Sequence, residues 1–238
     1  MFNFEDRVAI VTGAAGNLGG VLAHALNKAG ARLSLIDLYP DRLRETCGDI
    51  AESDRHRLIG SIDLTSESSV DGAVAETIQA FHRIDMLFNV AGGYRAGNPV
   101  SETSIEEWDL MLNLNARSVF LVSRAVLPHM LKRGTGHIVN FGARPGLKGV
   151  ADAAAYSAAK SVVLRLTESM SAELKRKGIH VNAVIPGRLD TPENREEKPK
   201  ANPSDWVSLQ AICDVIMFLA SDAAQAVHGA IIPVYGTG

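Results

Sequence analysis

Short apolar runs, rich in β-branched residues, alternate along this chain with longer stretches of helical periodicity. Runs without polar alternation are typical of strands that are buried on both faces, as in a parallel sheet. The alternation therefore predicts an α/β fold, a doubly wound Rossmann fold in which a seven-stranded parallel sheet carries helices on both faces. The predicted strands are Val8–Thr12, Ala31–Asp37, Arg57–Asp63, Asp85–Val90, His137–Phe141, His180–Ile185 and Ala230–Val234.

Six helices are predicted between and after these strands. Ser66, Ser104 and Ser208 each stand directly before one of them, where a hydroxyl can cap the first turn. The segment from Gly187 to Val207 holds three prolines and is predicted to be the least regular part of the chain. The predicted helices are Leu18–Lys28, Arg42–Glu52, Glu67–Phe81, Ile105–Lys132, Ala153–Lys177 and Leu209–Ala220.

Length and charge limit the classes of protein to which the chain can belong. Its 238 residues fit one α/β domain, which we expect to span 1–238. The net charge of −3 gives no basic footprint for nucleic acid. We expect no signal peptide, because the N-terminus leads directly into a strand, and no membrane span, because no apolar run approaches about 18 residues. We expect no metal site, because the two cysteines and seven histidines show no ligand spacing. A cytoplasmic protein is the expectation.

A small-residue turn, from Gly13 to Gly19, lies between the first predicted strand and the first predicted helix. Glycines there let the backbone approach a pyrophosphate, and the helix N-terminus offers unpaired N–H groups. Asp37 ends the second strand, about 20 residues further on, where a carboxylate accepts the ribose hydroxyls of NAD and repels the 2′-phosphate of NADP. A tight turn and a loop acid are the simpler alternatives.

Two further strand ends carry candidate nucleotide-binding groups. Asp63, followed by Leu64, can bond an adenine amino group, although a plain turn acid is nearly as good an interpretation. The fourth strand ends in Asn89, and Ala91 and Gly92 then place a small-residue backbone at the same edge.

Tyr156 and Lys160 open a long predicted helix and lie one turn apart on the same helix face. A phenol with a pKa near 10 is a poor base at neutral pH, but a nearby ammonium favours the phenolate. The pair then can exchange a proton with a carbonyl or an alcohol. An ordinary surface pair is the alternative where the nucleotide-binding context is missing.

These motifs together resemble the short-chain dehydrogenase/reductase family over nearly the whole chain. The resemblance implies that Tyr156 is the proton donor or acceptor and that Lys160 holds the nicotinamide ribose and lowers the pKa of the tyrosine. It implies that Asn115 anchors a water for proton relay. It also implies a set of cofactor contacts, which comprises Gly13, Asn17, Leu18, Gly19, Asp37, Asp63, Leu64, Asn89, Ala91, Gly92, Pro186, Gly187, Leu189 and Thr191.

Three positions depart from the family pattern. Asn17 replaces a usual glycine, and its side chain can cap the helix or bond a phosphate. Val90 replaces a frequent asparagine. Ala143 stands where the catalytic serine is expected, and a methyl group donates no hydrogen bond to a substrate oxygen. The departure implies a weak ketone reductase, a substitute donor, or a substrate that needs none.

Dihydropteridine reductase, a branch of this family, also lacks the serine, and the C-terminal half of the chain resembles it in part. Position indicates four substrate-side candidates: Tyr94, Ala143, Arg144 and Trp206. The expected function is NAD(H)-dependent hydride transfer to or from a small organic substrate, with a dihydropterin as one possibility. The alternatives are a generic carbonyl reductase or alcohol dehydrogenase, and a cofactor-binding protein with little catalysis.

The two longest predicted helices, Ile105–Lys132 and Ala153–Lys177, carry apolar residues on more than one face. We therefore expect self-association, and the family resemblance implies a homodimer or homotetramer.

Overall fold

The computed structural model describes residues 2–50 and 54–237, and its strands form one parallel sheet in the order β3-β2-β1-β4-β5-β6-β7. The predicted Rossmann fold is therefore confirmed, with its switch point between β1 and β4. The chain turns at Gly60 and Ser61, so the predicted extension of β3 to Asp63 is wrong. The strands are β1 (Val8–Thr12), β2 (Arg32–Ile36), β3 (His56–Ile59), β4 (Met86–Asn89), β5 (Gly136–Phe141), β6 (Ile179–Pro186) and β7 (Ile231–Val234).

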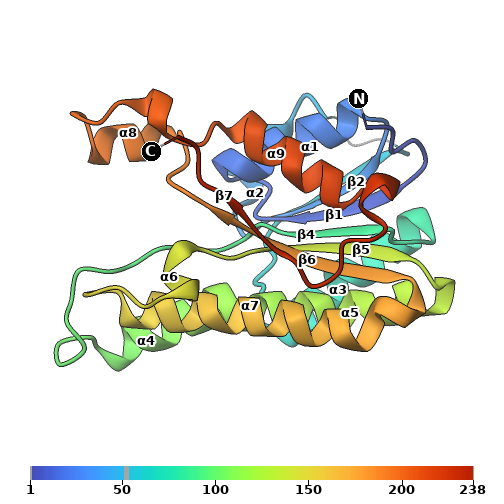
Figure 1. Cartoon of the computed structure of the whole chain (residues 1–238). Helices are drawn as coiled ribbons and strands as arrows, with labels where there is room; N and C mark the ends of the chain where they lie inside the picture. Colours follow the sequence, from blue (N-terminus) through green and yellow to red (C-terminus); the bar gives the residue numbers. More distant parts are fainter. Residues whose placement is uncertain (1, 51–53, 238) are drawn as a thin grey trace.

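Helices cover both faces of the sheet (Figure 1). Apolar side chains of α1, α2 and α9 form one buried core with the sheet, and those of α3, α5 and α7 form the other. The main helices are α1 (Asn17–Lys28), α2 (Pro40–Cys47), α3 (Glu67–Phe81), α4 (Ile105–Leu112), α5 (Ser118–Arg133), α7 (Ala154–Leu174) and α9 (Leu209–Leu219). The three predicted capping serines each accept a backbone N–H three residues on.

Several segments differ from the sequence expectation. The predicted helix Ile105–Lys132 is interrupted by a π-helical segment, η1 (Asn113–Arg117), between α4 and α5. Two short helices, α6 (Arg144–Leu147) and α8 (Pro192–Glu197), arise where none is predicted. The second predicted helix, Arg42–Glu52, is wrong at both ends, because α2 begins at Pro40 and ends at Cys47, with residues 48–50 in a turn; the predicted end at Glu52 lies outside the described residues.

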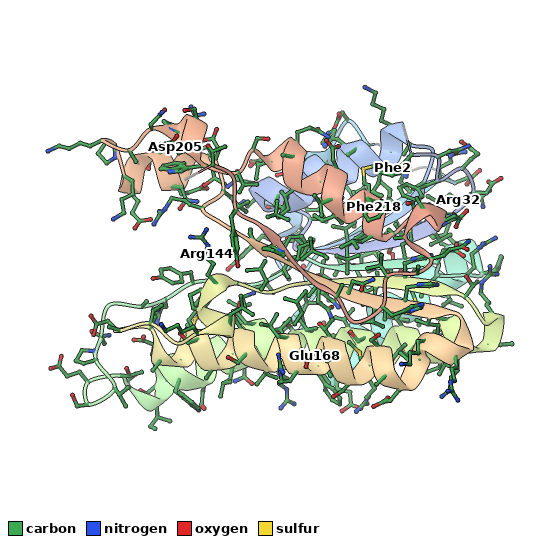
Figure 2. The ribbon with its side chains drawn as sticks, viewed as in Figure 1. Phe2, Arg32, Arg144, Glu168, Asp205 and Phe218 are labelled. Carbon is green, nitrogen blue, oxygen red and sulfur yellow. The ribbon has the colours of Figure 1, made fainter. Side chains whose placement is uncertain are left out.

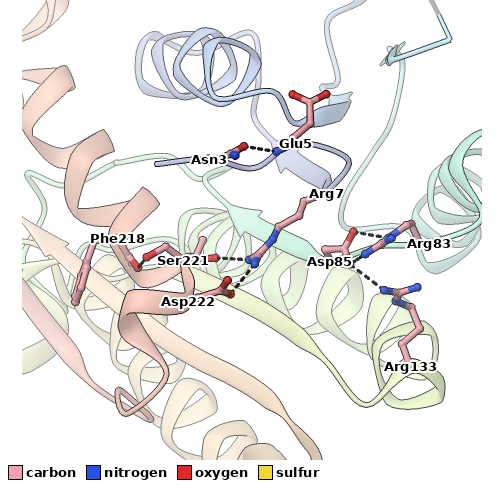
Figure 3. Close-up of polar contacts among 10 residues, drawn as sticks. Asn3, Glu5, Arg7, Arg83, Asp85, Arg133, Phe218, Ser221 and Asp222 are labelled. Carbon is pink, nitrogen blue, oxygen red and sulfur yellow. Dashed lines mark hydrogen bonds and ion pairs between the residues drawn. The ribbon is translucent and has the colours of Figure 1, made fainter. Parts of the chain in front are cut away.

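A single buried carboxylate fixes the edge of the sheet at which the strands begin (Figure 3). Asp85 Oδ2 accepts the N–H of Val8 at 2.8 Å, and both carboxylate oxygens bind the guanidinium of Arg83. Arg133, at the end of α5, lies 3.3 Å from Oδ1. The start of β1, the turn before β4 and the end of α5 are thereby joined, and the strands run from this edge toward the opposite one.

Together, α4, η1 and α5 form a helical stretch, Ile105–Arg133, that is long and apolar enough to cross a membrane, a feature that the sequence analysis did not anticipate. Half of the most apolar 18-residue part of this stretch is buried in the molecule. That burial is typical of a helix that packs on a sheet.

Candidate active site

A cleft of about 530 Å³ opens where the carboxyl ends of the strands meet. It is lined by residues that follow β1 to β6 and by side chains of η1 and α7. Gly13, in a left-handed conformation with φ of +67°, forms part of its floor. A Cβ atom at Gly13 would lie 2.8 Å from Cα of Ala91, so the backbones after β1 and β4 meet as closely as they can. Such a cradle fits a dinucleotide at the switch point.

The first turn of α1 faces this cleft through Leu18 and Gly19. Within the described residues no side chain caps this helix, so N–H groups of its first turn remain for an anion. Asn17 neither caps the helix nor lines the cleft, because its amide Nδ2 donates a hydrogen bond to Glu193 Oε2 of α8 at 2.7 Å. The capping role considered for Asn17 is therefore wrong.

Asp37 lines the cleft beyond the end of β2 and is almost fully buried, with 8% of its surface exposed. Its Oδ2 accepts the N–H of Ala15 at 3.0 Å, and its Oδ1 accepts the N–H of Tyr39 at 3.1 Å. These bonds hold the carboxylate beside the glycine turn, at the predicted ribose position. Arg42 lines the same end of the cleft and adds a positive charge that the sequence analysis did not assign.

Asp63 and Leu64 line the cleft after β3. Oδ1 of Asp63 accepts two hydrogen bonds from Thr65, at 2.8 Å from its N–H and 2.7 Å from its hydroxyl. The turn interpretation of Asp63 is thus realised in the structure, and contact with adenine stays a prediction.

Asn89, at the end of β4, is buried, and its side chain contacts the neighbouring strand β5 and helix α5. Its Nδ2 donates to Asn140 Oδ1 at 2.8 Å and to Ser123 Oγ at 3.2 Å. Asn89 does not line the cleft, whereas Ala91 and Gly92, which follow it, do. Its side chain therefore orders the strand end from which the cleft-lining backbone continues.

Tyr156 and Lys160 both lie in α7 and line the cleft. Lys160 Nζ donates to the carbonyl of Phe141 at 2.9 Å and lies 5.8 Å from the centre of the Tyr156 ring. Burial lowers the pKa of Lys160 to about 8. Burial, with a smaller contribution from Tyr94, raises the pKa of Tyr156 to about 12, opposite to the expected lowering. The phenol of Tyr156 is thus protonated at neutral pH.

Asn115 is fully buried at the centre of the π-helical segment. Its Nδ2 donates to the carbonyl of Gly93 at 3.0 Å and to that of Met111 at 3.1 Å, and its Oδ1 accepts the N–H of Gly93 at 3.2 Å. The side-chain amide thus fixes the loop after β4, a role that the sequence did not reveal. π-Helical turns are frequent at functional sites.

Of the predicted nicotinamide-side residues, Pro186 and Leu189 line the cleft, whereas Gly187 and Thr191 do not. A Cβ atom at Gly187 would lie 2.6 Å from the carbonyl oxygen of Tyr235, so this glycine permits the close approach of the C-terminal segment. Thr191 is buried and caps α8 through its hydroxyl.

Of the four substrate-side candidates, only Tyr94 is among the residues that line the cleft. Tyr94 lines the cleft, and its ring meets that of Tyr156 edge-on, with centroids 4.9 Å apart at 89°. Ala143 is buried at the start of α6. Arg144 extends from α6 away from α7, and its guanidinium lies 3.9 Å above the ring of Tyr235 (Figure 2). Trp206 does not line the cleft and packs near Arg188 instead.

Known proteins resemble the chain along nearly all of its length. The family model for short chain dehydrogenases matches residues 7–202. The (2S)-[(R)-hydroxy(phenyl)methyl]succinyl-CoA dehydrogenase subunit BbsD of Thauera aromatica is 35% identical over 98% of this chain and 96% of its own length. The 2-(R)-hydroxypropyl-CoM dehydrogenase of Xanthobacter autotrophicus is 35% identical, over 97% of this chain and 98% of its own. A crystal structure of levodione reductase superposes with a TM-score of 0.90, at 32% identity over 99% of this chain and 98% of that one.

The chain therefore belongs to the short-chain dehydrogenase family and is an oxidoreductase. Proteins of this family use nicotinamide cofactors, NAD or NADP, act on small molecules and often form oligomers.

Proposed function

We propose that this protein is an NAD(H)-dependent oxidoreductase that interconverts a small carbonyl compound and its alcohol, with Tyr156 as the proton donor. The observation that carries the proposal is that Tyr156 and Lys160 line the same cleft as the glycine turn at Gly13. The names of the relatives, which describe dehydrogenases of alcohols and a reductase of a dione, support this substrate class.

The residues of the cleft fit a nicotinamide dinucleotide. The Gly13 cradle and the uncapped first turn of α1 suit its pyrophosphate, and the Asp37 carboxylate suits the hydroxyls of the adenosine ribose and favours NAD over NADP. Asp63 and Leu64 would contact adenine. Ala91, Gly92 and the segment from Pro186 to Thr191, which includes Gly187 and Leu189, would surround the nicotinamide.

When bound, the cofactor supplies the hydride for carbonyl reduction or accepts it in the reverse direction. Tyr156 then donates its phenolic proton to the carbonyl oxygen, which becomes the hydroxyl of the alcohol. Lys160, with an ammonium that is buried and directed at the Phe141 carbonyl, would hold the nicotinamide ribose and supply positive charge beside the phenol. Because burial raises the pKa of Tyr156, the phenol carries the proton that carbonyl reduction consumes at neutral pH.

On the substrate side, Arg144 is exposed and, within the described residues, has no acidic partner. Arg144 does not line the cleft, and stacking on Tyr235 orients its guanidinium outside it, where it would attract a carboxylate on the distal part of a substrate rather than the reacting carbonyl. A quinonoid dihydropterin is the second candidate substrate, because reduction of such a ring does not need the donor that Ala143 lacks. A cofactor-binding protein with little catalysis is the remaining alternative.

We further propose a homodimer or homotetramer and a cytoplasmic location. Phe120, Leu131 and Val162, on α5 and α7, are exposed apolar side chains of the kind that self-association buries. Cys47 and Cys213 are buried and unpaired, which suits a reducing compartment.

The test is NADH oxidation with a panel of diacetyl, ethyl benzoylformate, isatin and a quinonoid dihydropterin. We expect turnover with at least one compound, and loss of that turnover in Tyr156→Phe with little change in NADH affinity, since the phenol acts on the substrate. Lys160→Ala should damage both turnover and NADH binding. Turnover that is equal in wild type and Tyr156→Phe would overturn the assignment of the proton donor, and inactivity on the whole panel would favour the cofactor-binding alternative.

A further inference from the structure

The site lacks one of the two hydrogen-bond donors that a carbonyl substrate is expected to need. Ala143 directly follows Phe141 and Gly142, which line the cleft, and only 7% of its surface is exposed. A side chain at position 142 cannot take over, because a Cβ atom there would lie 2.6 Å from a methyl group of Leu164. A second donor must therefore come from another element.

The side chains that line the cleft offer few donors. Tyr39, Arg42 and Thr65 follow β2 and β3, at the side of the sheet away from β5 and α7. Asn115 uses its amide on Gly93 and Met111, and Lys160 directs its ammonium at a backbone carbonyl. Besides the proton donor Tyr156, this leaves Tyr94.

Tyr94 lies beside Tyr156 and lines the same cleft. Its ring packs edge-on against that of Tyr156, and 69% of its surface is exposed. No group in the described part of the chain forms a hydrogen bond with its hydroxyl, so the proton is free for an incoming oxygen. The effect of Tyr94 on the pKa of Tyr156 agrees with the proximity of the two phenols.

The loop that carries Tyr94 is held in place by the π-helical segment η1. Asn115 forms hydrogen bonds with both the N–H and the carbonyl of Gly93, the residue just before Tyr94. A Cβ atom at Gly92 would lie 2.8 Å from Oδ1 of Asn115, and one at Gly93 would lie 2.6 Å from Leu114. The π-helical segment thus packs tightly against the loop. This packing fixes the position of the backbone from which the Tyr94 side chain extends.

We propose that the Tyr94 hydroxyl donates the second hydrogen bond to the carbonyl oxygen of the substrate, beside Tyr156, and so replaces the hydroxyl that position 143 lacks. Tyr94 keeps its proton and stabilises the negative charge that develops on the oxygen, whereas Tyr156 transfers its own. The inference rests on the proposed carbonyl reduction and adds a catalytic residue to it.

The experiment compares kcat/KM for NADH-dependent reduction of the panel compound that wild type turns over best. The variants are Tyr94→Phe, Ala143→Ser and their combination. Loss of a donor to an oxyanion lowers the rate by about 10²–10³-fold, so we expect a fall of this size in Tyr94→Phe, mainly in kcat. Ala143→Ser should change wild type less than about threefold and should restore Tyr94→Phe at least about tenfold, because the serine then fills a missing role.

Two controls separate this effect from a loss of fold. The thermal midpoint and the NADH affinity, measured by fluorescence titration, should be unchanged in Tyr94→Phe, which keeps the ring. Ser101→Ala removes an exposed hydroxyl from the same connection and should leave kcat/KM unchanged.

The proposal is overturned if Tyr94→Phe keeps more than about half of the wild-type kcat/KM while Tyr156→Phe is inactive. It is also overturned if Ala143→Ser raises kcat/KM equally in both backgrounds, or at least about tenfold in wild type, a measurement that does not depend on the folding of Tyr94→Phe. Equal turnover in wild type and Tyr156→Phe would instead reject the assigned proton donor itself, and with it this inference.

Discussion

The side chain of Asn17, in the first turn of α1, donates a hydrogen bond to Glu193, in the first turn of α8, across a distance of 2.7 Å. The two residues are separated by 176 positions in the sequence. The contact joins the helix that would bind the cofactor phosphates to the segment on the substrate side of the cleft. It also brings a carboxylate to a helix N-terminus that attracts anions.

Glu193→Gln should therefore strengthen NADH binding. Glutamine keeps an oxygen that accepts the hydrogen bond from Asn17 but removes a negative charge that repels the pyrophosphate. We expect the dissociation constant of NADH to fall by about two- to fivefold, a typical size for an exposed charge interaction, with a smaller gain at high salt. Fluorescence titration measures it, and Glu196→Gln on the same helix is the control. Unchanged or weaker binding would show that Glu193 does not oppose the phosphates.

The choice between NAD and NADP should depend on Asp37. Asp37→Asn keeps one oxygen for the N–H of Ala15 in the glycine turn, but it loses the second acceptor, which binds the N–H of Tyr39, and it removes the charge that opposes a 2′-phosphate. We expect NADH to bind about 10- to 100-fold more weakly, the usual loss for hydrogen bonds to a charged acceptor, and NADPH to bind more tightly with Arg42 nearby. Competitive titration of both cofactors checks this against Asp41→Asn, an exposed neighbour. Tighter binding of NADPH than of NADH by wild type would contradict the assignment.

The pH dependence of carbonyl reduction should report Lys160. Its pKa is lowered to about 8 by burial, so its ammonium is present below that pH and is lost above it. Tyr156, with a pKa of about 12, stays protonated throughout. We expect kcat/KM to be level near neutrality and to fall above about pH 8. Lys160→Arg, which cannot lose its charge in this range, should lower the rate but remove that fall. A profile with the same fall in Lys160→Arg would assign it to another group.

Acid should destabilise the fold through His137. This imidazole is buried, stacks on His180 with ring centroids 4.8 Å apart, and has its pKa lowered to about 4, first by burial and then by His180 and Arg7. Because the unfolded state binds a proton near pH 6.5 and the folded state does not, the free energy of unfolding falls as the pH is lowered from about 6.5 to 4. The loss is limited to about 3 kcal/mol.

Chemical denaturation across this pH range measures the effect. His137→Gln should flatten the dependence, whereas His129→Gln, on α5, should leave it unchanged. An equal slope in wild type and His137→Gln would contradict the prediction.

The strands and most helices could be predicted because each is a local pattern of residues. The prediction of Val8–Thr12 matches β1 in full, and the α3 prediction, Glu67–Phe81, matches in both bounds. Likewise, the hydroxyls of Ser66 and Ser104 cap helices that begin one residue later. Helix capping and buried apolar runs each involve only a few neighbouring residues, so the sequence itself indicates where these strands and helices lie.

The missed features depend on contacts between distant residues. Nothing local to Asn113–Arg117 distinguishes a π-helical turn from an α-helix, because the turn is accompanied by the bond between Asn115 and Gly93 of another loop. The pKa of Tyr156 was expected to fall because sequence shows Lys160 one turn away, but it does not show the burial that raises it. The stacking of Arg144 on Tyr235 likewise joins the start of α6 to the residue that follows β7, two segments far apart in the sequence.

Asp85 has a consequence for how the molecule opens. The N–H of Val8 is tied to this carboxylate, which two arginines also hold, so the start of β1 belongs to the most protected part of the sheet. Amide hydrogens there should exchange with solvent only through global unfolding, whereas those of the loops at the other strand ends exchange through small local openings. A ligand can then enter and leave at one end of the sheet on a fast timescale while the register of β1 against β4 survives every turnover.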